Sequence, residues 1–541
     1  MKNTFLNLLL FICLFSAKAQ QEFHVFPKQH QSAPGTATGN GSLTRPWDLQ
    51  TALNQKPAIV KSGDTIWIHE GVYNGRFLST LSAQTPNQFI TVSAYKNDSV
   101  ILNGNVNSKQ DGVLIVKGDR VRFKNFTITF LGDYSRDENE TDFQVCAGIM
   151  HLGGINCQFY NLNIHDNPGL GIGSWKHGAG SSIEHCIIYN NGFMSKGGKG
   201  RGEGIYVQNK SEDTRLIKNN IIFNNYYKGV EVWSAGKNAK LEYVKNITLD
   251  HNIIFNSGSP SGNHVDNVIV ASADRNGINS AKNIKLTSNI LWHNTQDANG
   301  NILGDAPALT LGFNKNVPIE QVVVEGNIIV GGYNGLRLLY AKSLNFSNNS
   351  VYSGNIQVGP SMEAYFEQWI FENNKFYSKL KKPFRVTRVK DYSLETWNQT
   401  FNLDTESEVF PRNQFNLEPV LHLSQQTLNK EIFSLALFNA EGQDVTVDFS
   451  TYQFKKGSSY KIYDVENPET VLKHGTLSEE KTIVVPMQNN GFQQPLHNSK
   501  AVKTNSNFGV FRIEFNAETE ANAETENNKT GFERFLEFLG L

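Results

Sequence analysis

The sequence KNNIIFNN (218–225), followed by GVEVWSA (229–235), carries the pattern that decides the fold. A polar pair, three β-forming residues and an Asn pair come first, and a short strand of alternating apolar and polar residues follows. Short β-branched runs bounded by Asn and Gly are typical of strands and turns, and they lack the 3.6-residue period of a helix. The architecture therefore depends on how this unit repeats along the chain.

The unit recurs from about residue 100 to 380, at irregular spacings between 22 and 38 residues. A helical repeat would keep a tighter period, so we predict a solenoid of β-strands with one coil per copy and variable loops on one side. Asn residues at equivalent turns are expected to stack their amides from coil to coil. The other copies are YNLNIHDN (160–167), EHCIIYNN (184–191), DHNIIFNS (250–257), TSNILWHN (287–294), EGNIIVGG (325–332), SNNSVYSG (347–354) and ENNKFYSK (372–379).

A second strand is predicted in each coil between the Asn copies. Successive side chains of a strand point to opposite faces, so aligning these strands by their apolar residues separates an inward set from an outward set. The inward set contains Ile172, Ile205, Val207, Val230, Val232, Val268, Val270, Leu309, Leu311, Leu336 and Leu338. The outward set contains Trp175, Tyr206, Gln208, Glu231, Trp233, Thr310 and Arg337, which a core does not need.

The bulk composition and the N-terminus limit the class of protein. The net charge of −1 and the pI near 6.9 give no general attraction to nucleic acid or to an anionic membrane. Residues 1–19 combine Lys2, an apolar run and Ala17-Lys18-Ala19, which predicts a cleaved signal peptide, export to the periplasm or medium, and no membrane span. The three remaining cysteines are expected to be buried free thiols: Cys146, Cys157 and Cys186.

The coils with Asn turns resemble the pectate-lyase-like right-handed parallel β-helix family over residues 22–430. GNGSLTRPWDLQTAL (39–53) resembles the N-terminal cap of such proteins, with a short helix near 47–54 that covers the open end of the solenoid. DYSLETWNQTFNLDTES (391–407) resembles the helix and loop that close these domains. Because lyases and hydrolases both occur on this fold, the resemblance implies a secreted polysaccharide-degrading protein without specifying its reaction.

The complete prediction is an all-β chain. It has a signal peptide (1–19), a right-handed parallel β-helix with a cap helix (20–429), a small antiparallel β-sandwich (430–515) and an acidic, disordered tail (516–541). The sandwich is expected to be an accessory domain, and the chain a monomer whose partner is a polysaccharide.

The candidate site lies on the outward set near residues 165–275. Parallel strands lie about 4.8 Å apart, so matching positions on successive coils are neighbours. The candidate catalytic residues are Lys199, Arg201, Glu203, Glu231, His264 and Asp266. The candidate substrate-binding residues are Trp175, Lys176, His177, Tyr206, Gln208, Trp233 and Arg275. Structural roles remain open for each of them, above all for Glu203, which can bind turn amides between its two glycines.

Three functions fit these residues. The favoured one is β-elimination on a uronate polysaccharide, which needs a base, a proton donor and a cation or metal at the substrate carboxylate; Glu231 and Asp266 are candidate Ca²⁺ ligands. The alternative is glycoside hydrolysis by a carboxylate pair drawn from Glu203, Glu231, Asp266 and Asp166. The third is a glycan-binding or adhesive solenoid without catalysis. The acidic segment 132–143 is expected to be an exposed insertion.

Overall fold

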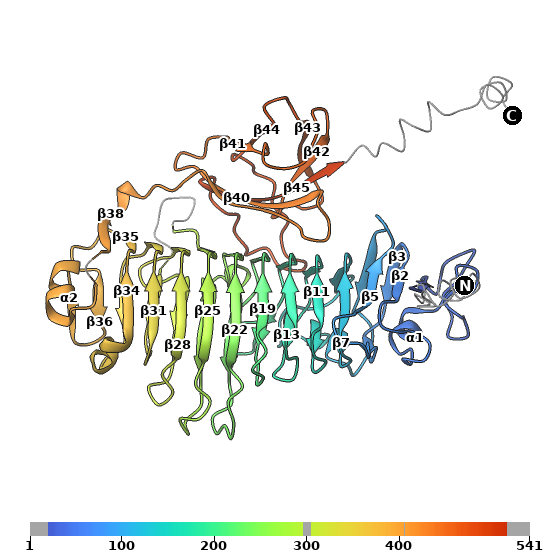
Figure 1. Cartoon of the computed structure of the whole chain (residues 1–541), viewed down its shortest axis with the longest axis horizontal. Helices are drawn as coiled ribbons and strands as arrows, with labels where there is room; N and C mark the ends of the chain where they lie inside the picture. The colour runs from blue at the N-terminus through green and yellow to red at the C-terminus, as the bar shows by residue number, and fades with distance from the viewer. Residues whose placement is uncertain (1–19, 296–303, 405, 517–541) are drawn as a thin grey trace, which may run out of the picture.

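The structure, a computed structural model, describes residues 20–295, 304–404 and 406–516. The predicted signal peptide and the predicted tail beyond Asn516 lie outside these residues. Three sheets of 12 strands each form the faces of a β-helix, and Figure 1 shows its coils stacked along the long axis of the molecule. Each coil passes through the first, second and third sheet in turn, and strands of successive coils pair in parallel.

The strands of the first sheet are β1 (Glu22–Val25), β2 (Thr65–Ile68), β5 (Ile90–Ala94), β8 (Val121–Lys124), β11 (Gln158–Tyr160), β14 (Ser182–Glu184), β19 (Arg215–Lys218), β22 (Lys245–Asp250), β25 (Lys282–Thr287), β28 (Glu320–Glu325), β31 (Leu344–Ser347) and β34 (Trp369–Glu372). Those of the second sheet are β3 (Gly71–Asn74), β6 (Val100–Asn103), β9 (Thr127–Thr129), β12 (Asn163–His165), β15 (Ile187–Tyr189), β20 (Ile221–Phe223), β23 (Ile253–Phe255), β26 (Ile290–Trp292), β29 (Ile328–Val330), β32 (Ser350–Tyr352), β35 (Lys375–Ser378) and β38 (Glu408–Pro411).

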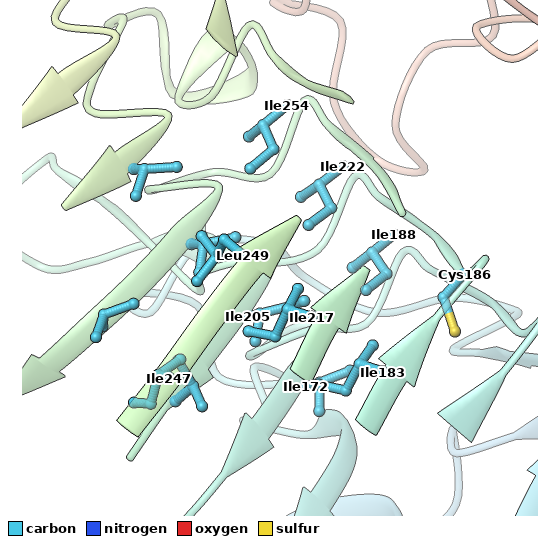
Figure 2. Packing of buried hydrophobic residues seen from close by; sticks show 14 of the residues in the cluster. Ile172, Ile183, Cys186, Ile188, Ile205, Ile217, Ile222, Ile247, Leu249 and Ile254 are labelled. Carbon is cyan, nitrogen blue, oxygen red and sulfur yellow. The ribbon is translucent and has the colours of Figure 1, made fainter. Parts of the chain in front are cut away.

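The third sheet carries the candidate site. Its strands are β4 (Phe77–Ser79), β7 (Gly112–Val116), β10 (Ala147–His151), β13 (Ile172–Ser174), β18 (Ile205–Val207), β21 (Val230–Ser234), β24 (Val268–Ser272), β27 (Leu309–Leu311), β30 (Leu336–Leu338), β33 (Ile356–Val358), β36 (Phe384–Val386) and β37 (Lys390–Tyr392). All eleven residues predicted to point inward are fully buried. Figure 2 shows Ile172 and Ile205 among the other aliphatic side chains of this core, close to Ile217 and Ile183.

Asparagine ladders hold the turns together, as predicted. At the turn between the first and second sheets, each side-chain amide donates to the carboxamide oxygen of the next coil at 2.9–3.0 Å, through Asn220, Asn252, Asn289, Asn327, Asn349 and Asn374. The residue before each ladder position has a left-handed backbone, with φ between 53° and 66°. This explains the polar pair of the sequence: its first residue makes the turn, and its second joins the ladder.

Short helices lie at both ends of the solenoid. Helix α1 (Leu49–Leu53) begins at Asp48, whose carboxylate accepts from the Thr51 N–H at 3.0 Å. Helix α2 (Leu394–Phe401) begins at Ser393 with a capping box and buries Trp397 completely. Both helices lie where the sequence predicted caps.

The C-terminal part folds into two antiparallel sheets around their own core. The larger sheet contains β39 (Val420–Gln425), β40 (Ile432–Phe438), β45 (Phe508–Asn516), β42 (Ser459–Asp464) and β43 (Val471–Thr476), and the smaller one β41 (Val445–Asp448) and β44 (Thr482–Val485). The sandwich therefore starts before residue 430, because β39 pairs with β40.

The sandwich lies against the second sheet. The chain leaves the far end of the solenoid after β38 and returns over its middle coils (Figure 1). A buried apolar cluster joins the two parts, with Tyr189, Phe223, Phe255 and Trp292 on the solenoid and Phe438, Val465, Phe508 and Val510 on the sandwich. Cys146, Cys157 and Cys186 are buried free thiols, as predicted. Among the described residues, no helix has the length and apolar character needed to cross a membrane.

Candidate active site

The outward residues of the third sheet form one row across successive coils. Tyr206 pairs with Glu231, Glu231 with Ile269, Ile269 with Thr310, and Thr310 with Arg337. The alignment of the sequence thus gives the correct register. The prediction that these side chains face solvent is wrong for three of them, because Glu231 and Thr310 are each only 4% exposed and Gln208 is only 7% exposed. The row is a partly covered layer and not a solvent-exposed stripe.

A second row lies at the entrance to these strands. The Gly204 N–H donates to the Lys228 carbonyl at 2.9 Å, and the Gly229 N–H donates to the Asp266 carbonyl at 3.3 Å. Glu203, Lys228 and Asp266 therefore occupy matching positions on three coils. Lys228 was not among the residues predicted from the sequence. Its position could have indicated it, because Lys228, Glu203 and Asp266 each lie two residues before an inward residue.

Lys228 joins the carboxylates of the site. Its ammonium forms an ion pair with the Glu231 carboxylate, and both side chains are at most 10% exposed. Burial works against the charge of Lys228, but Glu231 and then Asp266 outweigh it and raise the pKa of the amine above its ordinary value. The Asp266 carboxylate accepts a hydrogen bond from the Thr310 hydroxyl. Lys228 thus stays protonated beside the carboxyls of Glu231 and Asp266.

Glu203 is the carboxyl of the cluster that solvent reaches. Its side chain is half-buried, whereas Glu231 is buried. Burial raises the pKa of Glu203 to about 8, and the nearby charge of Glu231 and a hydrogen bond between the two carboxyls act in the same direction. At neutral pH Glu203 therefore carries a proton, next to the carboxyl that pairs with Lys228.

A steric constraint explains why glycine occupies position 202, directly before Glu203. Gly202 has φ +97°, and a Cβ there would lie 2.6 Å from the Gly169 carbonyl oxygen on the preceding coil. Only glycine fits this close approach. The turn therefore presents Glu203 at the mouth of β18 while neighbouring coils remain in contact.

Glu203 also lines an open hollow of about 680 Å³. One wall is the hairpin of β16 (Phe193–Met194) and β17 (Gly200–Arg201), which brings Lys199 and Arg201 to the same hollow. Both cationic side chains are exposed. The remaining lining residues include Glu138, Val145, Leu170, Phe193 and Lys196. The hollow thus combines apolar side chains with three cationic side chains and the carboxyls of Glu138 and Glu203.

The acidic segment 132–143, predicted to be an exposed insertion, is exposed only in part, because it packs against this wall and Glu138 lines the hollow. Tyr134 and Arg136 are buried, at 5% and 4% exposure. The Glu138 N–H donates to the Met194 carbonyl at 2.9 Å, which joins the segment to the hairpin.

Aromatic rings extend the site along the sheet. The rings of Trp175 and Tyr206 lie 5.0 Å apart, and the Lys228 ammonium lies 5.6 Å from the Trp233 ring. The Gln208 amide donates to the Tyr206 hydroxyl and to the Trp233 carbonyl, both at 3.2 Å. Burial and then the charge of Glu231 raise the pKa of Tyr206, so its phenol stays protonated. Partly exposed rings of this kind fit the apolar faces of sugars.

Other predicted residues lie apart from this cluster. Lys176 covers the Tyr243 ring at 4.7 Å, and His177 and Arg275 are exposed in loops. The His264 ring lies 5.1 Å from His293, and burial lowers the pKa of His264 to about 4. In the part of the chain that the structure describes, no hydrogen bond or ion pair joins these residues to Glu203.

Asp166, a candidate of the hydrolase alternative, is structural. Its carboxylate is 1% exposed, and it pairs with Arg136 at 2.8 Å and with His165 at 2.9 Å.

The pair Glu231 and Asp266 does not fit a calcium ion. The Lys228 ammonium contacts Glu231 and interacts through its charge with Asp266, so a cation of the protein already lies near both carboxyls. Ca²⁺ requires six to eight oxygen ligands. Within the described ranges, no group of three or more His, Cys, Asp or Glu side chains has the arrangement of a metal site.

Comparison with known proteins agrees with the fold. Residues 85–243 match the family model described as a right-handed β-helix region, which confirms the predicted handedness and resemblance. No significant match was found among curated proteins.

Solved structures with a similar fold include a rhamnogalacturonan lyase with 15% identity and a TM-score of 0.43, covering 74% of this chain and 89% of that one. A pectate lyase has 16% identity and a TM-score of 0.41, with coverages of 72% and 78%. The alginate lyase from Paenibacillus sp. str. FPU-7 has 18% identity and a TM-score of 0.39, with coverages of 67% and 99%. Likenesses at this level concern the fold and carry no argument about the reaction.

Proposed function

We propose that the protein cleaves a polysaccharide on the outer face of its third sheet, by β-elimination at a uronic acid. The observation that carries the proposal is Glu203, a half-buried carboxyl that is paired with Glu231 and shares an open hollow with Lys199 and Arg201. Lys199 and Arg201 would bind the carboxylate of the sugar, and Trp175 and Tyr206 would contact neighbouring sugar rings.

The proposed reaction has two proton transfers, one to Glu203 and one from Tyr206. Ionised Glu203 would take the proton from the ring carbon next to the uronate carboxylate, and the electron pair of that C–H bond would form the new double bond. The bond from the neighbouring ring carbon to the glycosidic oxygen breaks, and this oxygen takes a proton from the Tyr206 hydroxyl. A base with a pKa of about 8 has a useful ionised fraction at mildly alkaline pH.

The Lys228–Glu231 pair would tune Glu203 without touching the substrate. Glu231 raises the pKa of Glu203 and Lys228 lowers it, so the ion pair sets the pH at which the base becomes available. Lys228 itself is held in its charged form and is not a base.

The burial of Glu231 in an ion pair disfavours hydrolysis by the pair Glu203 and Glu231. Retaining glycosidases hold their two carboxyls about 5–5.5 Å apart and inverting ones about 6.5–9.5 Å apart, with the glycosidic bond between them. Glu231 is only 4% exposed and its carboxylate contacts the Lys228 ammonium, so a glycosidic bond does not reach it.

The test is incubation of the purified protein with a panel of uronate-containing and neutral polysaccharides. Elimination leaves an unsaturated uronate, which absorbs in the ultraviolet, and Glu203→Gln should abolish that signal. New reducing ends without the absorbance would identify a hydrolase instead. Tight binding without any cleavage over the whole panel would identify a glycan-binding protein.

A further inference from the structure

The outer face of the third sheet changes from apolar to charged between neighbouring coils. Its outward row continues from Tyr206 to Gly173, Met150 and Ile115 on the preceding coils. These three residues have no polar side chain, whereas Glu231 follows Tyr206 on the next coil. The sheet therefore has an apolar half before β18, and the charged cluster of the candidate site begins at β18.

The row at the entrance to the strands changes at the same coil. The Gly171 N–H donates to the Glu203 carbonyl at 2.9 Å, so Leu170 occupies on the preceding coil the position that matches Glu203. The Gly148 N–H donates to the Leu170 carbonyl at 2.8 Å, which places Ala147 one coil further back. Parallel strands lie about 4.8 Å apart, which is close to the length of one sugar unit in an extended chain. A sugar next to the one at Glu203 would therefore lie over Leu170.

Three side chains meet over the backbone of β13 on this apolar half. A Cβ on Gly173 would lie 2.9 Å from the Leu170 Cδ1 atom and 3.2 Å from the Met150 Sδ atom. It would lie 3.5 Å from the indole nitrogen of Trp175. Because Leu170 also lines the open hollow, a continuous apolar surface joins the hollow to the Trp175 ring.

Two further apolar side chains line the hollow beside Leu170. Val145 is 49% exposed, and the half-buried ring of Phe193 lies 4.8 Å from the ring of Phe143. Contact with an apolar group of a ligand would remove this surface from water, which is favourable. The exposed cations of the hairpin line the same hollow, so an acidic ligand with an apolar group matches both features. The apolar subsite, as defined here, consists of Val145, Met150, Leu170, Trp175 and Phe193.

We infer that the apolar subsite binds a methyl-bearing substituent on the sugar next to the cleaved uronate. The inference rests on the proposed function for the position of the uronate, but the binding preference does not require cleavage. Two substituents have this chemistry, an O-acetyl ester and the methyl group of a 6-deoxy sugar. A sugar with hydroxyl groups alone would lose hydrogen bonds to water on this surface. The substrate is therefore an acidic polysaccharide that is acetylated or contains deoxy sugars.

The experiment compares probes that differ in this substituent. Polygalacturonate and alginate are each used with and without O-acetyl groups, and a polymer of alternating galacturonate and rhamnose is the 6-deoxy probe. Calorimetry measures the binding of each probe to the full chain, and ultraviolet absorbance measures elimination.

The variants are Leu170→Ser and Val145→Ser. Leu170 is half-buried, so Val145→Ser, at an exposed position, decides the question if Leu170→Ser does not fold. The matched control is Val484→Ser, because Val484 is 42% exposed on β44 of the sandwich. Circular dichroism checks that each variant is folded.

We expect the Kd of an acetylated or 6-deoxy probe to be about tenfold lower than that of the bare uronate polymer, because a methyl group in an apolar pocket discriminates by about this factor or more. Each serine variant should reduce the ratio to less than about threefold, and the control should retain it. A preference for the acetylated probe identifies the ester, and a preference for the rhamnose polymer identifies the deoxy sugar.

Equal affinities for all probes, no binding to any of them, or a ratio that survives both serine substitutions would overturn the inference. A loss of the ratio in the control as well would also overturn it. A tenfold preference without ultraviolet absorbance would contradict the proposed function and leave the apolar subsite intact. Absorbance with equal affinities would leave the proposed function intact and remove the subsite.

Discussion

Lys228 forms an ion pair with the buried carboxylate of Glu231, and Glu203 lies on the neighbouring coil, where the charge of Glu231 helps to raise its pKa. The two glutamates therefore lie in different environments. Glu231 is held in an ion pair, whereas Glu203 has a raised pKa and reaches the open hollow. Pairs of titrating groups whose surroundings differ in this way are common at catalytic sites.

Glu231→Gln should lower the pKa that governs activity. The substitution removes the negative charge that raises the pKa of Glu203 and leaves Lys228, which lowers it. The pH profile of kcat/KM should therefore move to lower pH by about one unit or more. An unchanged profile in a folded variant would show that Glu231 does not act on the titrating group.

Arg201→Gln should weaken binding of acidic substrates. Arg201 is exposed at the hollow and contacts only the Tyr227 ring among its described side-chain interactions, at 5.8 Å. We expect KM for a uronate polysaccharide to rise about tenfold with a small change in kcat, and the dependence of KM on salt to decrease. Lys285→Gln is the matched control, because Lys285 is an exposed cation on the first sheet. Equal effects of the two substitutions would point to general charge attraction.

Asn252→Ala should destabilise the solenoid at its centre. The Asn252 side chain accepts from the Asn220 N–H and amide, at 3.1 and 2.9 Å, and donates to the Ile217 carbonyl and to Asn289, both at 2.9 Å. Its removal leaves buried polar groups unpaired, so the free energy of unfolding should fall by about 2–5 kcal/mol. Asn219→Gly, at the neighbouring left-handed position, should change it by less than about 1 kcal/mol. Urea unfolding measures both, and equal losses would contradict a special role of the ladder.

Acid should destabilise the fold through its buried histidines. Burial lowers the pKa of His185 and His422 to about 4 and that of His151 to about 3, with a further contribution to His151 from the charge of Arg215. In the unfolded chain these groups take up protons near pH 6.5, so the unfolded state binds more protons below that pH. The free energy of unfolding should therefore decrease as the pH falls from about 6.5 to about 4. Constant urea midpoints across this range would contradict the prediction.

The repeat and the register were predictable because the Asn turn has a specific chemistry. One residue must adopt a left-handed backbone and the next must present a carboxamide to both neighbouring coils, so the pair Asn219 and Asn220 is visible in the sequence. The alternation of Val230, Glu231 and Val232 likewise fixes which residues share a face.

The sequence of single strands did not predict two features: the burial of the outward residues of the third sheet, and the packing of the sandwich against the second sheet. Glu231 is buried because Lys228, a residue of the preceding turn, folds over it. The second sheet is apolar on both faces, with Ile222 inside and Ile221 and Phe223 outside. Such a pattern indicates a covered outer face, but it does not name the segment that covers it.

The most direct test of the central claim is the pH dependence of kcat/KM on a cleaved uronate polysaccharide. If ionised Glu203 is the base, kcat/KM should rise with pH to a plateau above an apparent pKa of about 8, and Glu203→Gln should lose about 100-fold or more at every pH. A rate that falls as the pH rises through 8, or a Glu203→Gln variant that retains the rising profile, would contradict the assignment of Glu203 as the base.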